Sequence, residues 1–162
     1  MPPYTTSIAA IQDFLAKKRV AIIGVSRNPK DFSACLFTEF VKRGYDVVPV
    51  NPKSPEVLGR TSFGRVQDIR PPVEAVLLMT KPEVTDAVVA DCADAGVRHI
   101  WMYRAGGSGA VSPKAVEFCQ QHEIALIPGE CPYMFFPRNG LHAIHGLVRK
   151  ITGTYPKAER AA

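Results

Sequence analysis

Two short stretches of the chain decide its fold: residues 19–30 read RVAIIGVSRNPK, and residues 44–53 read GYDVVPVNPK. Each contains a run of apolar, mostly β-branched residues, and the residues between the runs carry a helical pattern. Such a strand–helix–strand order is typical of a βαβ unit, and Gly24 directly after the first strand is where such units approach nucleotides. The two stretches therefore predict a nucleotide-binding βαβ unit.

This unit lacks two features of NAD-binding sites, which usually show G-x-G-x-x-G after the first strand and an acid after the second. Here the first loop has the single glycine Gly24, and the second strand leads to Asn51 and Lys53. Lys53 and Arg27 suit a phosphate close to an adenosine ribose. Coenzyme A (CoA) carries such a phosphate on the 3′ position and NADP on the 2′ position, so the residues alone leave both ligands open.

Strand-like runs alternate with helical patterns along the rest of the chain. We expect strands at residues 19–23, 46–50, 75–79, 98–102 and 125–127. We expect helices after Ser7, from about 33 to 44, from Pro82 to Gly96, from Ser112-Pro113 onward and at 141–153. This order predicts an α/β fold, a single-domain doubly wound five-stranded parallel sheet (Rossmann-like) with helices on both faces. The domain should span residues 1–153, with a surface excursion at 52–72 that holds a short helix near 65–69, and 154–162 should be a flexible tail.

The loops at residues 24–30, 51–54 and 80–82 should meet at the carboxyl edge of this sheet, where doubly wound folds bind ligands. Gly24 would let a phosphate approach the backbone amides that follow it, and the Ser26 hydroxyl could add a donor. The alternative is that Gly24 only makes a tight turn. Thr80-Lys81-Pro82 is either a plain helix start or a third wall of the site, suited to an adenine.

The same residues resemble the small bacterial CoA-binding proteins, whose Rossmann-like domain is also the N-terminal domain of the succinyl-CoA synthetase alpha subunit. The resemblance covers roughly residues 15–135, and its motifs are 20–27, 44–53, Leu58-Gly59, Lys81-Pro82, Ile100-Trp101 and Glu130-Cys131-Pro132.

The resemblance implies that CoA is the ligand and that phosphate lies on the first loop, at Gly24, Val25, Ser26 and Arg27. It implies that Lys53, with Asn51 and Pro52, approaches the nucleotide, and that the remaining site residues are Met79, Thr80, Lys81, Pro82, Met102, Tyr103 and Arg104. Residues 102–109 depart from the run found in many relatives, which affects the expected pantetheine end. The histidine-bearing second domain of the synthetase does not fit in 162 residues, so ligase activity by this chain alone is not expected.

The net charge of +5 and pI near 9.1 fit an anionic partner. Lys and Arg are scattered rather than gathered into a stripe with aromatics, so nucleic acid is not the expected partner. The N-terminus has no signal-peptide pattern and no apolar run approaches the roughly 18 residues of a membrane span, which predicts a cytoplasmic protein without a membrane partner. A homo-oligomer is left open.

Other chemistry has little support in the sequence. The four cysteines form no C-x-x-C pair and are expected to be free thiols. His142 and His145 are three residues apart without the H-E-x-x-H pattern of a zinc helix, and Gly24-Val25-Ser26-Arg27-Asn28 lacks the second glycine of a hydrolase elbow. No catalytic or metal site is therefore predicted. Cys131 is either a buried small side chain or a thiol near the reactive end of CoA.

The sequence thus favours a non-catalytic module, regulatory or a carrier, that binds CoA or an acyl-CoA. The alternative from the enzyme class is an NAD(P)-binding oxidoreductase or redox sensor, with Arg27 and Lys53 holding a 2′-phosphate. A third hypothesis is a subunit-interaction module that has lost its ligand.

Overall fold

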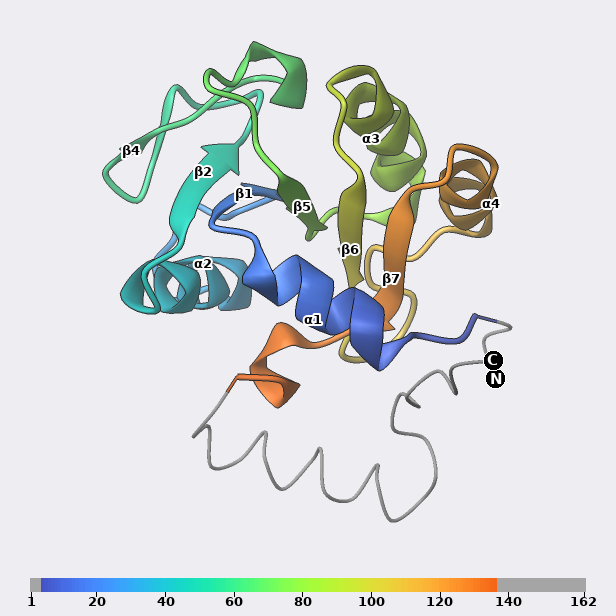
Figure 1. The fold of residues 1–162 in the computed structure, drawn as a ribbon. Coiled ribbons are helices and arrows are strands. Elements are labelled where there is room, and N and C mark those ends of the chain that lie inside the picture. The colour runs from blue at the N-terminus through green and yellow to red at the C-terminus, as the bar shows by residue number, and fades with distance from the viewer. Residues whose placement is uncertain (1–3, 137–162) are drawn as a thin grey trace.

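Five parallel strands pair side by side in residues 4–136, the part of the chain that the computed structural model describes (Figure 1). The strands are β1 (Arg19–Ile23), β2 (Asp46–Val50), β5 (Ala75–Leu78), β6 (His99–Tyr103) and β7 (Ala125–Glu130), in the spatial order β2-β1-β5-β6-β7. The expected bounds of β1 and β2 are those observed. β5 ends one residue earlier than expected, β6 is shifted by one residue, and β7 continues three residues further, to Glu130.

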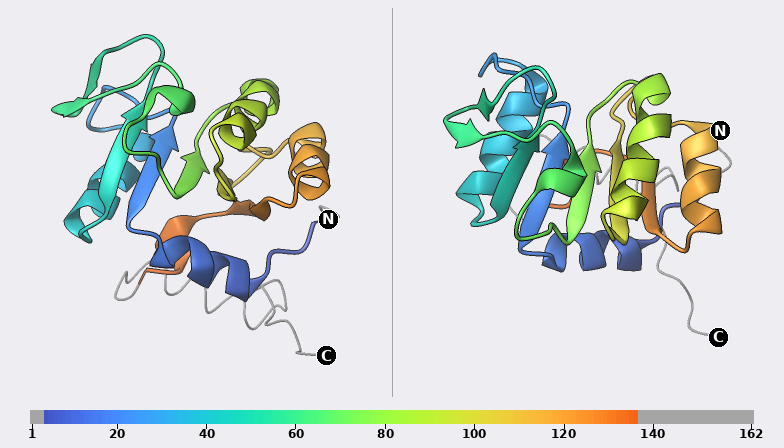
Figure 2. Two further views of the ribbon diagram at one scale, coloured as in Figure 1. Left: turned by 45° about the horizontal axis from the view of Figure 1, so that its top comes forward. Right: turned by 90° about the horizontal axis from the view of Figure 1, so that it is seen from above.

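Within the described residues, four α-helices cover the two faces of this sheet (Figures 1 and 2). They are α1 (Ile8–Ala16), α2 (Phe32–Lys42), α3 (Pro82–Asp94) and α4 (Pro113–Gln121). Helices α1 and α2 pack on one face, and α3 and α4 on the other, which confirms the doubly wound α/β fold. The helix expected at 141–153 and the tail expected at 154–162 lie outside the described residues, so the domain bounds stay a prediction.

Alternate residues of each strand enter two separate cores. On β1, Val20 and Ile22 pack toward α1 and α2, whereas Ala21 and Ile23 pack toward α3 and α4. Phe14 of α1 meets Trp101 of β6 edge to face, with ring centroids 5.2 Å apart. Because both faces are covered, the strands need apolar residues at every position, which explains why they read as continuous apolar runs.

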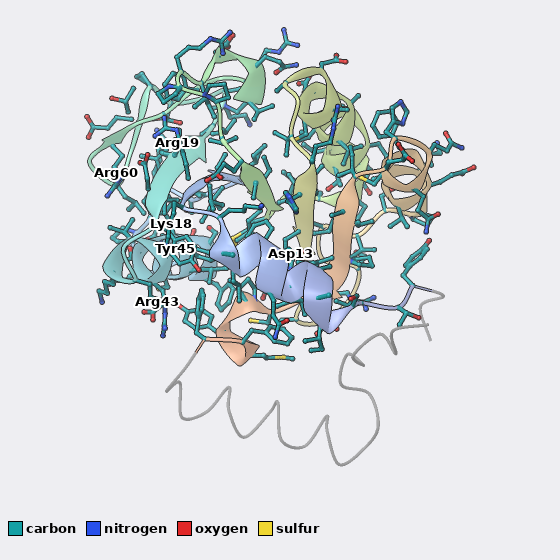
Figure 3. The ribbon with its side chains drawn as sticks, in the orientation of Figure 1. Asp13, Lys18, Arg19, Arg43, Tyr45 and Arg60 are labelled. Carbon is teal, nitrogen blue, oxygen red and sulfur yellow. The ribbon has the colours of Figure 1, made fainter. Side chains whose placement is uncertain are left out.

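Polar contacts hold the amino edge of the sheet. Arg19 at the start of β1 forms an ion pair with Asp46 at the start of β2, and the Tyr45 hydroxyl donates to the Leu15 carbonyl oxygen at 2.7 Å (Figure 3). The Glu74 carboxylate accepts from the backbone N–H groups of Lys18 and Arg19 at 3.1 and 3.2 Å. Structural interactions therefore occupy this edge, opposite the loops at which the sequence predicts ligand binding.

The excursion between β2 and β5 contains more structure than expected. Two antiparallel strands of two residues each, β3 (Glu56–Val57) and β4 (Arg60–Thr61), form a hairpin. The 3₁₀ helix η1 (Val66–Asp68) follows it, within the short helix expected near 65–69. Between them, Phe63 pairs in parallel with Val50 of β2. The chain thus returns to the outer edge of β2 before it crosses to β5.

Candidate functional site

The loops after β1 and β5 lie at the carboxyl edge where the strand order reverses, and they lead to α2 and α3 on opposite faces of the sheet. Gly24, which follows β1, has a φ of +92°, and a Cβ there would lie 2.7 Å from the Met79 carbonyl oxygen. Only glycine therefore fits without a shift of the backbone. The close approach of the two loops supports the tight-turn interpretation of Gly24, and it also brings the loop after β1 beside Thr80.

A first cavity of about 360 Å³ adjoins the carboxyl ends of β1 and β2 on the α3 side. Most of its wall is apolar, from Ile23, Val25, Val50, Pro52, Val66, Val84 and Val88. Its other lining residues are Gly24, Asn51, Gly64, Arg65, Thr80 and Asp91. An apolar cavity with a few polar groups is the kind of site that takes a flat base such as adenine.

A second cavity, of about 650 Å³, shares Gly24 and Thr80 with the first. Its further lining residues are Asp31, Phe32, Ser33, Met79, Lys81, Pro82, Glu83, Tyr103, Ser108 and Gly109. The amino ends of α2 and α3 thus both border this cavity. Helix amino ends present backbone N–H groups without intrahelical partners and favour anions, so a diphosphate suits the place where the two cavities meet.

The loop from Gly24 to Asp31 has many internal hydrogen bonds. The Ser26 N–H donates to Ser33 Oγ at 3.0 Å, and the Ser26 hydroxyl donates to the Asp31 carboxylate at 2.5 Å. Asn28 Nδ2 donates to the same carboxylate at 3.0 Å. The Ser26 hydroxyl, expected as a donor to the ligand, is therefore already engaged, and the backbone N–H groups of the first turn of α2 are the better candidates for holding phosphate.

Two threonine hydroxyls contact each other beside the wall between the cavities. Oγ1 of Thr85, which is fully buried in α3, lies 3.2 Å from the Lys81 carbonyl oxygen. It also lies 2.7 Å from Thr80 Oγ1, and either hydroxyl can be the donor in that contact. The Thr80 hydroxyl is therefore already engaged on its α3 side.

Aromatic side chains form one wall of the second cavity. Phe32 is 41% exposed, and its ring centroid lies 5.2 Å from that of Tyr103 and 5.7 Å from that of Tyr133. Burial raises the pKa of Tyr103 to about 12, so this hydroxyl stays neutral. Among the described residues, Phe32 and Val84 are the exposed large hydrophobics, and each lines one cavity. The site therefore presents apolar surface that a ligand could cover.

Nine of the fourteen expected site residues line one cavity or the other: Gly24, Val25, Asn51, Pro52, Met79, Thr80, Lys81, Pro82 and Tyr103. The other five lie elsewhere. Ser26 is bound within its loop, and Arg27 and Lys53 are exposed on the loops after β1 and β2. Met102 is fully buried in the core, and the Arg104 guanidinium packs against Gly129.

Sequence reasoning missed a pair of charged residues in the first cavity. Arg65, just before η1, and Asp91 on α3 both line it, and Arg65 Nη2 lies 3.1 Å from Asp91 Oδ1. No motif marks Arg65, because it follows a segment with weak patterning. Phe32 and Asp31 were also missed, although their place at the start of α2 follows from the helix boundary.

The cysteines differ in their exposure. Cys131 follows β7 at the carboxyl edge, as expected, but it is 4% exposed, and burial raises the pKa of its thiol. Burial likewise raises the pKa of the Cys92 thiol and, to about 12, that of Cys119. Cys35, in the first turns of α2, is the exposed one. The geometry thus favours the buried-side-chain interpretation of Cys131.

The described residues contain neither a candidate membrane span nor a candidate metal site. None of the helices in this part of the chain is long and apolar enough to traverse a bilayer. No group of three or more His, Cys, Asp or Glu side chains is placed to hold a metal ion there. His142 and His145 lie outside the described residues.

Comparison with known proteins relates this site to a family. The model of a family described as a CoA binding domain matches residues 18–137. The chain is 25% identical over 126 residues to the uncharacterized protein YneT of Bacillus subtilis, covering 77% of this chain and 90% of that protein. It is 34% identical over 103 residues to a trans-feruloyl-CoA synthase from an unknown prokaryotic organism. That match covers 62% of this chain but only 14% of the synthase.

A solved structure agrees with these matches. A hypothetical protein from Pyrococcus horikoshii OT3 superposes with a TM-score of 0.71 at 27% identity, covering 80% of this chain and 92% of that one. The family match spans both cavities and every strand of the sheet. The chain therefore belongs to the CoA-binding domain family.

Proposed function

We propose that this chain binds CoA, or an acyl-CoA, across the two joined cavities. The adenosine would occupy the first cavity and the diphosphate the junction at Gly24 and Thr80. The pantetheine arm would follow the second cavity toward Phe32 and Tyr103. One observation carries the proposal: an apolar, base-sized cavity joins a larger cavity that is bordered by two helix amino ends. The chain in which this arrangement occurs belongs to a CoA-binding family.

We further propose that binding serves a regulatory or carrier role and not a reaction. Among the described residues, the linings of the two cavities contain neither histidine nor cysteine, the usual base and thiol nucleophile. The related synthase is far longer than this chain, which spans 14% of it. The catalytic activity of the synthase would then depend on its remaining sequence, which this match does not cover.

Calorimetric titration tests the ligand. CoA should bind, and dephospho-CoA should bind more weakly by on the order of 1.5–3 kcal/mol, the range of charged hydrogen bonds. NADP and NAD are titrated in parallel, because a 2′-phosphate would suit the same cations. Tighter binding of NADP than of CoA would favour the oxidoreductase or redox-sensor alternative. No binding of either would point to a module that has lost its ligand.

A further inference from the structure

Arg65 is the one cation among the described residues that line the first cavity, and Asp91 holds it in an ion pair at 3.1 Å. We propose that Arg65 receives the phosphomonoester on the ribose of the bound adenosine, and that Asp91 is its resting partner until the ligand arrives. The inference rests on the proposed function and deepens it by naming the residue that distinguishes a phosphorylated ribose from a plain one.

Backbone pairing positions Arg65 at the carboxyl edge. The Asn51 N–H donates to the Phe63 carbonyl oxygen at 2.9 Å, and the Phe63 N–H donates to that of Pro49 at 3.2 Å. Arg60 on β4 adds a hydrogen bond of 3.4 Å to the Val47 carbonyl oxygen on β2 (Figure 3). Because the segment at Phe63 runs parallel to β2, the two residues after it emerge beside Asn51, at the nucleotide end of the site.

The ion pair is of a kind that a phosphate can displace. The Arg65 side chain is 61% exposed, and exposed ion pairs are weak. Asp91 Oδ1 also accepts from Gln67 Nε2 at 2.7 Å, so the carboxylate keeps a partner when Arg65 turns away. A phosphomonoester carries more charge than a carboxylate and offers two oxygens to the planar guanidinium fork, so it should outcompete Asp91.

Lys53 and Arg27, the cations expected from the sequence, have a different position. Both are exposed, and neither lines either of the two cavities. They can attract an anionic ligand from the rim, whereas Arg65 belongs to the wall that the adenosine would touch. Replacing Lys53 should therefore weaken binding less than replacing Arg65.

The test uses three small nucleotides: adenosine 3′,5′-bisphosphate, adenosine 2′,5′-bisphosphate and AMP. Each is titrated calorimetrically into the wild type, Arg65→Gln, Asp91→Asn and the double variant. We expect the wild type to prefer the 3′,5′-bisphosphate to AMP by about tenfold or more, and Arg65→Gln to lose that preference while it binds AMP almost unchanged. Asp91→Asn should tighten bisphosphate binding about two- to fivefold, because it weakens the competing ion pair. Most of that gain should vanish in the double variant, since the competition needs Arg65.

Matched controls separate this effect from a change in net charge. Asp94→Asn alters an exposed carboxylate one turn further along α3, outside the first cavity, and Lys42→Gln removes an exposed cation at the end of α2. Neither should change the bisphosphate preference. Melting curves check that each variant folds.

The outcomes separate the inference from the proposed function. A bisphosphate preference that survives in Arg65→Gln would overturn the inference while CoA binding stands. Failure of the wild type to bind both CoA and the bisphosphate would overturn the proposed function, and the inference with it. An Arg65-dependent preference for adenosine 2′,5′-bisphosphate would uphold the role of Arg65 and overturn CoA as the ligand.

Discussion

Gly24 shows how one residue can be required for both the fold and the site. Its positive φ and the contact that a Cβ would make with Met79 are independent reasons for glycine. The sequence suggested that Gly24 makes room for a phosphate. In the structure, Gly24 also makes room for the loop at Met79. A substitution of Gly24 should therefore lower stability as well as ligand binding.

Gly44 provides a comparison for Gly24, because both have a positive φ. Gly24→Ala and Gly44→Ala both place a Cβ at a positive φ, which costs about 1–2 kcal/mol. Gly44 has nothing within 4 Å of an added Cβ, whereas Gly24 has the Met79 backbone at 2.7 Å. Urea unfolding should therefore show a larger loss of unfolding free energy for Gly24→Ala. Equal losses would mean that the two loops separate freely and that Gly24 serves ligand approach alone.

Thiol reactivity should distinguish Cys35 from the other three cysteines. Cys35 is exposed, and the other three cysteines are buried, with pKa values raised by burial. A thiol-specific reagent at pH 8 should label one cysteine fast in the native protein and all four in denaturant. Cys35→Ser should abolish the fast phase, and Cys131→Ser should keep it. If Cys131→Ser removes the fast phase instead, Cys131 is accessible and the hypothesis of a thiol near CoA gains support.

At the scale of elements, the sequence predicted those that carry strong local signals. β1 and β2 are continuous apolar runs with Gly24 and Asn51 directly after them, and their bounds were right to the residue. Ser7 and Ser112 cap α1 and α4 through their side chains, as their positions before apolar-periodic segments indicated. The doubly wound parallel sheet needed one further assumption, that the crossovers between strands are right-handed.

The elements that were missed depend on contacts between distant residues. β3 and β4 have two residues each, too few for a period, and the turn between them places Leu58 at a φ of 51°, where Asn or Gly is usual. The pairing of Phe63 with Val50 leaves no local pattern at all. Arg65 was missed for the same reason, because its place in the site follows from that pairing.

The cations of the site illustrate the same limit. The sequence assigned Lys53 and Arg27 because they belong to loops that had to meet at the carboxyl edge. The order of strands and loops predicts where a loop lies. It does not predict whether a long side chain on that loop lines a cavity or extends into solvent. Nine expected residues line the cavities because strand ends position the backbone there, whereas Met102 turns into the core since side chains alternate along β6.

At the scale of the whole molecule, the two edges of the sheet have separate roles. The carboxyl edge carries both cavities, and the amino edge carries Arg19 with Asp46 and Glu74 with two backbone N–H groups. His99, at the start of β6, belongs to the amino edge, and its Nδ1 is buried without a hydrogen-bond partner among the described residues. Substitutions at the amino edge should therefore change stability without changing ligand binding.

The pH dependence of stability tests this separation. Burial lowers the pKa of His99, Lys17 lowers it further, and Asp13 and Glu74 oppose the shift in part. Since the folded pKa lies below the unfolded value of about 6.5, the unfolded state binds more protons as the pH falls. His99 thus contributes stability that is fully present above pH 6.5 and is lost as the pH falls through its folded pKa.

The free energy of unfolding, measured by urea titration, should accordingly decrease from pH 7.5 to pH 5.5 in the wild type. It should decrease less in His99→Gln, because that variant has no proton to bind at this position. Because His99 lies at the edge opposite the cavities, His99→Gln should also keep the CoA affinity of the wild type at pH 7.5. An unchanged pH slope would show that the imidazole is hydrated in the folded state, and a loss of CoA binding would show that the two edges are coupled.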